Sequence, residues 1–258
     1  MLNLFLQATL IIFILVTLLW IWSIFLVNVS IVDIFWGTGF VVVNAFYFFN
    51  LEAIHPRNIL LLVLVSLWGL RLSIYLAARN IGKGEDSRYK QFRKNYGPDR
   101  YWWFSYFQVF LLQGALIMII SLPLLGAHYF TSENHLLWSD YLGVTVWLIG
   151  FIFEAGGDYQ LARFKKDPSN KGRVLDSGLW KYTRHPNYFG DSAVWWGYGI
   201  LCLSAGSYWP ALGSILMTLL IIRVSGVALL EKSLNTEKAG YSEYIRKTSP
   251  FIPWFPKK

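Results

Sequence analysis

The sequence predicts an all-α, polytopic membrane protein with about seven transmembrane helices and an amphipathic C-terminal helix. Of its 258 residues, 55% are hydrophobic and only 15% are charged, whereas soluble domains carry about 25% charged residues. Seven stretches approach or exceed the length needed to cross a membrane, which is about 20 apolar residues. The 19 Phe, 15 Tyr and 13 Trp are typical of aromatic belts at both membrane interfaces. These features indicate one membrane domain.

The first predicted span carries no charge, and it lacks the basic start and the cleavage site of a signal peptide. Asp33 lies in the second span and Arg71 in the third. Pro123 is expected to bend the outer end of the fourth, because proline cannot donate a helical hydrogen bond. The fifth span continues as helix through Glu154 and Asp158. In order, the spans are Leu2–Val27, Ile31–Phe49, Asn58–Ala78, Phe104–Gly126, Leu142–Phe153, Tyr188–Leu203 and Trp209–Leu230.

The loop charges predict an orientation. Lys and Arg crowd the loops Arg79–Tyr101 and Gln160–Asn187 and the C-terminal tail, whereas Ala127–Asp140 and Ser204–Tyr208 have none. The positive-inside rule therefore places both basic loops and the C-terminus in the cytoplasm, with the N-terminus outside. The membrane would be a bacterial inner membrane or the endoplasmic reticulum.

The composition narrows the classes of partner. The net charge of +8 is explained by the positive-inside bias and by affinity for anionic membrane lipid, so no nucleic acid is expected. No feature indicates an obligate protein partner. The single cysteine, Cys202, allows no internal disulfide and makes a zinc–thiolate site implausible. Neither a glycine-rich dinucleotide fingerprint nor a P-loop is present, so a nucleotide would bind among helices.

In this topology every charge within a predicted span falls in the cytoplasmic half. The pattern favours a water-accessible cavity that opens to the cytoplasm. The alternative is that Arg71 and Arg223 extend to the phosphates of the inner leaflet. The short carboxylates of Asp33 and Asp191 cannot reach as far, and charges inside a membrane indicate function by default. We expect Asp33 and Arg71 to meet there.

Two groups of polar residues follow the fifth span. Glu154 and Asp158 are four residues apart and share one helix face, so a donor or cation is expected between the two carboxylates. The alternative is two acids that face bulk water. The basic loop, with Lys165 and Arg173 among its cations, is weak evidence by itself.

The run Arg184-His185-Pro186-Asn187-Tyr188 is more specific. Pro186 favours the start of a helix, and helix N-termini bind anions. Arg184 could bind phosphate, while Asn187 and Tyr188 could bond a ring or an amide. Interfacial anchoring is the alternative. The tail, with Tyr241 and Tyr244, is predicted to form an amphipathic helix that folds back and caps the site; the alternative is a membrane-surface helix.

Several segments carry a resemblance to a known superfamily. Arg-His-Pro-Asn-Tyr-Phe-Gly-Asp at 184–191 resembles the signature of the membrane steroid 5-alpha-reductase and sterol C14-reductase superfamily. Phe-Lys-Lys-Asp-Pro at 164–168 is similar to a basic element of that group. The segments Trp-Gly-Leu-Arg at 68–71, Gly-Glu-Asp-Ser-Arg-Tyr at 84–89 and Thr-Ser-Pro-Phe-Ile-Pro-Trp at 248–254 resemble its DUF1295 branch.

The resemblance implies NADPH bound from the cytoplasm by the C-terminal helices (142–258), with the lipid substrate on the side of the N-terminal helices (1–126). Asp33 then corresponds to a Glu that polarises the substrate carbonyl in steroid 5-alpha-reductases. Trp68 occupies the position of their Tyr, with Arg71 and Tyr75 one and two turns further on. The cofactor residues so implied, together with those of the basic loop and tail, are Glu154, Asp158, Lys165, Arg173, Arg184, His185, Asn187, Tyr188, Asp191, Arg223, Tyr241 and Tyr244.

Three functions are consistent with these features. The first is reduction of a carbon–carbon double bond in a steroid-like or other lipid by NADPH, with Tyr75 or Asp33 as proton donor. The second is a lipid or isoprenylcysteine-type methyltransferase that uses S-adenosylmethionine, since those enzymes share an Arg-His-Pro-x-Tyr run. Asn187, Asp191 and the basic loop favour a phosphate-bearing cofactor. The third is a non-catalytic lipid-binding protein.

Overall fold

The computed structural model describes residues 1–225 and 240–257. Throughout these ranges the secondary structure is helical, apart from one isolated bridge between Thr183 and Ser249, which confirms the all-α prediction. The chain divides into two units. The first comprises Met1–Leu136 with Ala205–Pro210, and the second Leu137–Ser204 with Ala211–Lys258.

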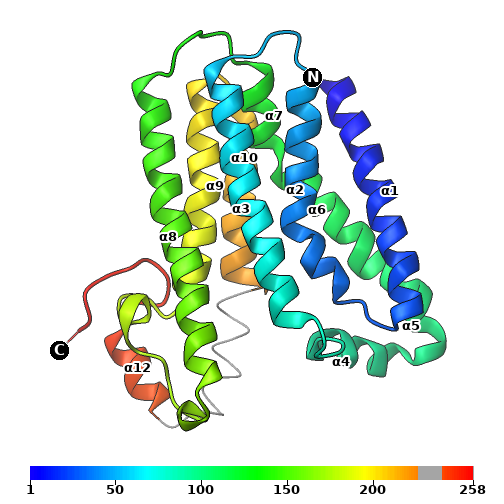
Figure 1. Cartoon of the computed structure of the whole chain (residues 1–258), viewed down its shortest axis with the longest axis vertical. Helices are drawn as coiled ribbons and strands as arrows, with labels where there is room; N and C mark the ends of the chain where they lie inside the picture. The colour runs from blue at the N-terminus through cyan, green and yellow to red at the C-terminus, as the bar shows by residue number, and fades with distance from the viewer. Residues whose placement is uncertain (226–239, 258) are drawn as a thin grey trace. The chain divides into compact units, whose positions relative to one another are not determined.

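The first unit contains four helices that are long and apolar enough to cross a membrane, so the protein is an integral membrane protein (Figure 1). They are α1 (Leu2–Leu26), α2 (Ile31–Phe49), α3 (Pro56–Asn80) and a continuous run, Pro98–Tyr129. That run comprises α5 (Pro98–Ser105), the π-helical η1 (Tyr106–Leu111), α6 (Leu112–Ile120) and α7 (Leu122–Tyr129). These four match the first four predicted spans, and the count of seven stays a prediction.

Close backbone contact joins α2 to α3. A Cβ atom built on Gly37 would lie 2.2 Å from the carbonyl oxygen of Gly69, so no larger residue fits either position. The amide and hydroxyl of the next residue, Thr38, both donate to Ser73 Oγ, one turn after Gly69, at 2.9 Å each. Small residues that let backbones approach are typical of helix pairs in membranes.

Two local features of the first unit have clear sequence causes. The helix breaks at Ser121, between α6 and α7, two residues before Pro123, as predicted for a proline without an N–H group. The predicted loop Arg79–Tyr101 instead contains a helix, α4 (Ser87–Tyr96). Its start is capped by the Asp86 side chain, which accepts from the Arg88 amide, and its end by Gly97 at φ 79°.

One buried charge lies just outside the predicted third span, 58–78, and the placement of the charges within the spans in the cytoplasmic half stays a prediction. Arg57, in the first turn of α3, is 1% exposed and donates to Thr131 Oγ1 at 3.1 Å. It lies toward the opposite end of α3 from Arg71 and is followed by Asn58, which forms a buried polar cluster with His128 and Asn44. Arg57 was not among the span charges considered in the sequence because α3 begins at Pro56, before the apolar run that the sequence pattern detects.

In the second unit, α8 (Trp138–Lys166) and α9 (Pro186–Ser204) run side by side (Figure 1). Between them lie short 3₁₀ turns, η2 (Pro168–Asn170) and η3 (Gly178–Lys181). After η4 (Trp209–Ala211), the chain continues with α10 (Leu212–Leu219), the π-helical η5 (Leu220–Ser225) and, at its end, α12 (Tyr241–Lys247). Parts of the predicted seventh span and tail helix fall on residues 226–239 and lie outside the described residues.

Glycines hold α8 and α9 together. A Cβ on Gly190 would lie 2.3 Å from the backbone nitrogen of Glu154 and 2.5 Å from the carbonyl oxygen of Gly150. Gly143 and Gly197 make a similar contact nearer the other end of the pair. Because the backbones touch, the first turns of α9 lie directly against residues 150–158 of α8, which include Glu154 and Asp158.

Candidate functional site

The carboxylates of α8 meet the start of α9. Glu154 and Asp158 are both buried, at 3% and 5% exposure. The Asn187 side-chain amide donates to Asp158 Oδ1 at 3.2 Å, while its own Oδ1 accepts from the Tyr188 amide at 3.1 Å. Asn187 therefore supplies a donor to Asp158, and the burial of both carboxylates argues against two acids that face bulk water; a donor between the two stays a prediction.

The other predicted residues of the segment 184–191 lie at the start of α9. His185 is buried, and its ring stacks on Tyr188, with centroids 5.6 Å apart. Asp191 is half-buried one turn further on. The structure thus brings Glu154, Asp158 and Asn187 together beside the helix start that sequence analysis expected to bind an anion.

Arg184 holds the C-terminal segment. Its Nη1 atom donates to the carbonyl oxygens of Ile245 and Thr248, at 3.0 and 2.9 Å, and its backbone amide donates to Ser249 O at 2.9 Å. The residue is 7% exposed. Part of the guanidinium that sequence analysis assigned to phosphate therefore binds the end of α12.

The tail does fold back, as predicted, onto the segment that precedes α9. Tyr241 and Tyr244 are buried on α12, with ring centroids 6.0 Å apart. The Tyr244 hydroxyl donates to Trp180 O at 2.5 Å. Burial raises the pKa of this hydroxyl, which keeps it protonated as a donor. The two tyrosines help to build the tail contact; their role toward a cofactor stays a prediction.

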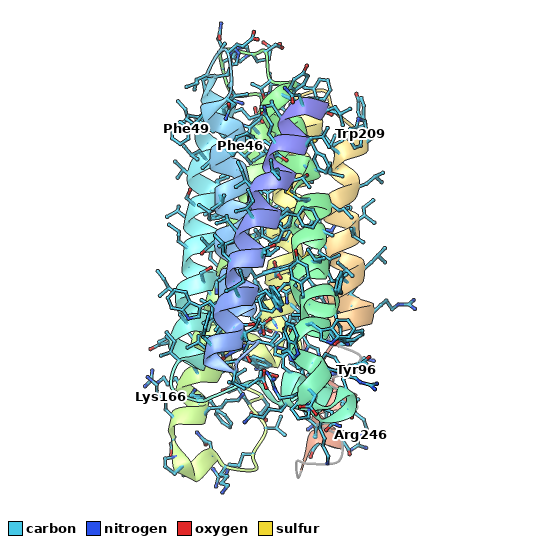
Figure 2. All side chains as sticks on the ribbon, turned by 90° about the vertical axis from the view of Figure 1, so that its right-hand side faces the viewer. Phe46, Phe49, Tyr96, Lys166, Trp209 and Arg246 are labelled. Carbon is cyan, nitrogen blue, oxygen red and sulfur yellow. The ribbon has the colours of Figure 1, made fainter. Side chains whose placement is uncertain are left out.

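The remaining predicted cofactor residues are cations on the surface of this unit. Lys165 lies in the last turn of α8, Arg173 in the loop after η2 and Arg223 in η5, and all three are exposed. Lys166 and Arg246 lie at the same end of this unit (Figure 2). This end of the unit is therefore strongly basic.

Replacing Arg184 by glutamine should release the tail. The change removes two charge-assisted hydrogen bonds, each worth about 1.5–3 kcal/mol, so trypsin should cleave at Arg246 and Lys247 much faster than in the wild type. Arg246→Gln, at an exposed position of α12, is the matched control and should leave cleavage at Lys247 unchanged. Equal tryptic stability of the Arg184 variant would show that α12 is held by other contacts.

In the first unit, Asp33 lies in a hydrogen-bonded cluster with α4. Its Oδ2 atom accepts from Arg88 Nη2 at 2.9 Å. Its Oδ1 atom accepts from the Tyr89 hydroxyl at 2.7 Å and from Gln113 Nε2 at 3.3 Å. The ion-pair partner is thus Arg88, which sequence analysis placed in a loop; the pairing with Arg71 stays a prediction.

The same segment docks on the chain just before α2. Glu85 accepts from the Val29 amide at 3.0 Å and forms a bidentate pair with Arg93, at 2.8 and 3.0 Å. The Asp86 amide donates to Ser30 Oγ at 2.6 Å. The motif at 84–89 is therefore a structural latch that joins α4 to the start of α2.

The pKa shifts in the latch keep the Tyr89 hydroxyl protonated and the Asp86 carboxylate ionised. Burial, followed by the Asp33 carboxylate, raises the pKa of the Tyr89 hydroxyl, so this group remains a donor to Asp33. Burial alone would raise the pKa of Asp86, but the hydrogen bonds and charge of Arg88 outweigh it and hold that pKa below 3.8. Asp86 therefore stays ionised at neutral pH.

Arg71 and Tyr75 lie elsewhere in the first unit, on one face of α3. They line an open groove of about 500 Å³ together with Ser66, Leu67, Leu70 and Ile74. Asp33 is not among the lining residues, and neither is Trp68, which is fully buried against Phe40 with ring centroids 5.7 Å apart. The three predicted catalytic residues are thus divided between the α4 latch and the α3 groove.

Residues 19–248 match the family described as "Protein of unknown function (DUF1295)". The chain belongs to this family. Because the match covers most of the chain, it includes both the α8–α9 cluster and the α4 latch. No solved structure matches this DUF1295 protein.

Three curated relatives extend the comparison. The DUF1295 protein is 26% identical over 216 residues to "Uncharacterized protein C594.04c" of Schizosaccharomyces pombe, covering 75% of this chain and 63% of that protein. It is 29% identical over 96 residues to "Steroid 5-alpha-reductase DET2" of Arabidopsis thaliana, covering 36% and 35%. The Gossypium hirsutum protein of the same name is 24% identical over 129 residues, covering 49% and 48%. The chain spans between about a third and two thirds of these relatives.

Sequence analysis missed Arg88, Tyr89 and Gln113 as the partners of Asp33. Asp86 and Gly97 are residue types that indicate the start and end of a helix, α4, but they do not indicate that this helix packs against the start of α2. It also missed the link from Arg184 to the tail of the DUF1295 protein. In each case the partners lie more than 50 residues apart in the chain.

Proposed function

We propose that this DUF1295 protein is a membrane reductase that uses NADPH to reduce a carbon–carbon double bond of a steroid-like or other lipid. The observation that carries the proposal is the cluster of the buried carboxylates of Glu154 and Asp158 with the half-buried Asn187. Buried carboxylates inside a membrane protein are costly and indicate function. The similarity to two proteins named steroid 5-alpha-reductase supports the reaction class.

The cluster offers the groups that a dinucleotide requires. Asp158 would accept from a ribose hydroxyl, and Asn187 would bond the nicotinamide carboxamide. The exposed cations Lys165 and Arg173 lie at the same end of α8 and would pair with the phosphates, including the 2′-phosphate. When bound, NADPH supplies a hydride to one carbon of the double bond.

The α3 groove offers the groups that a lipid substrate requires. Leu67, Leu70 and Ile74 line it with apolar surface, and Arg71 and Tyr75 add one cation and one hydroxyl. Arg71 would polarise an oxygen of the substrate, and the Tyr75 hydroxyl would donate a proton to the second carbon. Asp33 already pairs with Arg88 and accepts from Tyr89, so we assign the proton to Tyr75 and a positioning role to Asp33.

Cofactor binding can be measured by the thermal stability of the detergent-solubilised protein. We expect NADPH to stabilise it more than NADH does, because only NADPH carries the 2′-phosphate. Asp158→Ala should weaken NADPH binding by roughly ten- to a hundred-fold, the value of one hydrogen bond to a charged group. Asp176→Ala, at an exposed acid of the same unit, is the control and should bind normally.

The competing functions give different results in the same assay. Stabilisation by S-adenosylmethionine, without any response to NADPH, would replace the reductase with a methyltransferase. No response to either cofactor would favour a non-catalytic lipid-binding protein.

A further inference from the structure

The face of α8 that points away from α9 carries an apolar stripe. Leu148, Ile149 and Ile152 are all strongly exposed, Ile152 at 59%. About two and three turns beyond Ile152, on the same face, lie Tyr159, 64% exposed, and Arg163. In a chain that spans a membrane, such a stripe is suited to the acyl chains of lipid.

The stripe ends in a pocket. A cavity of about 550 Å³ lies between this face of α8 and the segment 167–178, with Gly156, Tyr159, Gln160 and Arg163 along one wall. The opposite wall is tied to the helix. The Leu179 amide donates to Gln160 Oε1 at 3.0 Å, and Asn170 Nδ2 donates to Phe164 O at 3.1 Å. The loop is thus held against α8 at both ends of the pocket.

The pocket is lined by an arginine, Arg163, that makes no polar contact with the described residues. Within residues 1–225 and 240–257, the Arg163 guanidinium makes no hydrogen bond or ion pair. The one carboxylate in the lining, Asp167, accepts from the Ser169 amide at 2.9 Å, and hydrogen bonds from Ser169, followed by the charge of Arg173, lower its pKa. Arg163 is therefore the uncommitted charge.

This pocket is distinct from the proposed cofactor cluster. In a helix of 3.6 residues per turn, Glu154, Asp158 and Lys165 share one face, whereas Gly156 and Arg163 lie on the opposite one. Gly157, on the face of the carboxylates, contacts α9: a Cβ there would lie 3.1 Å from the Asn187 nitrogen. The α8 helix therefore carries two sets of polar groups, one on each face.

We propose that the pocket binds the headgroup of an anionic phospholipid, with its phosphate on Arg163 and an acyl chain along Leu148, Ile149 and Ile152. The exposed cations Lys166, at the end of α8, and Lys171, on the adjoining loop, favour a net negative headgroup. Basic pockets at this position relative to a helix bind such lipids. The Tyr159 ring lies between the charged and apolar parts, where aromatic side chains are enriched.

Native mass spectrometry of the full chain in detergent tests the proposal, with phosphatidylglycerol and phosphatidylcholine as probes. We expect phosphatidylglycerol to be retained preferentially. Arg163→Gln should weaken its retention about tenfold, and Arg163→Lys should preserve most of it. Arg246→Gln, at another exposed arginine of the same unit, should change nothing. Ile152→Gln should also weaken retention, because it interrupts the stripe.

Displacement of phosphatidylglycerol by other anions tests whether the pocket requires a phospholipid. Glycerol phosphate at millimolar concentration should not displace phosphatidylglycerol, since it lacks the acyl chain. Displacement by glycerol phosphate, or retention unaffected by Ile152→Gln, would indicate a site for free anions and overturn the proposal. Displacement by adenosine 2′,5′-bisphosphate would assign the pocket to a nucleotide and overturn it as well.

Retention of phosphatidylglycerol is measured independently of the proposed reductase activity. Arg163→Gln should leave NADPH stabilisation intact, and Asp158→Ala should leave phosphatidylglycerol retention intact. Equal retention of both lipids by the wild type and by Arg163→Gln would show that the pocket does not select an anionic headgroup.

Discussion

Tyr75→Phe should lower the rate of lipid double-bond reduction by about 100- to 10,000-fold, the contribution of a positioned proton donor. The change removes only the hydroxyl, which lies in the α3 groove beside Arg71. NADPH should still stabilise the variant as it does the wild type, because Tyr75 is not part of the α8–α9 cluster. The measurement is consumption of NADPH with a steroid enone or a membrane lipid extract as substrate.

The matched control is Tyr129→Phe, at a half-exposed tyrosine that ends α7, which should retain the wild-type rate. If Tyr75→Phe were fully active while Asp33→Asn was inactive and folded, the proton would come from the α4 latch. Tyr89, whose hydroxyl touches the Asp33 carboxylate at 2.7 Å, would then be the next residue to replace.

Gly190→Ala should destabilise the second unit by about 3 kcal/mol, near the upper end for overpacked positions. The added Cβ would lie 2.3 Å from the Glu154 nitrogen and 2.5 Å from Gly150 O. Both are backbone atoms, so α8 and α9 must separate. Because Asn187 and Asp158 are on the two helices, the variant should also lose NADPH binding. Thermal unfolding, with and without NADPH, measures both effects.

Gly114→Ala is the corresponding control. Its Cβ would meet only methyl groups of Val16 and Ile12, at 3.3 Å and beyond, and these side chains can shift slightly. Alanine also favours a helix over glycine by up to about 1 kcal/mol, so stability should change little. Equal destabilisation by the two substitutions would mean that the glycine contact at Gly190 is not tight.

The local features of this protein followed from its sequence. Apolar length predicted α1, α2 and α3 within a few residues, because a membrane-spanning helix must satisfy its own backbone hydrogen bonds in a hydrophobic solvent. The spacing of Glu154 and Asp158 predicted a shared helix face, and Pro123 predicted the break after α6. The tail was also expected to return to the segment before α9.

Local sequence patterns did not predict which residues pair with the charged side chains. Asp33 pairs with Arg88, and Arg184 bonds the carbonyls of Ile245 and Thr248, although the pattern along each helix contains no information about either contact. The buried Arg57 lies outside the predicted span 58–78 because its helix begins before the apolar run.

Sequence alone therefore determined the helical membrane class of this protein, the approximate ends of its first helices and the residues that share a helix face. These are local properties, set by hydrophobic length, by a period of 3.6 residues and by proline. Only the tertiary structure decided which faces meet, which carboxylate pairs with which cation, and where a groove or a pocket remains. Those outcomes depend on close packing between segments distant in the chain, such as the backbone contact of Gly190 with Glu154.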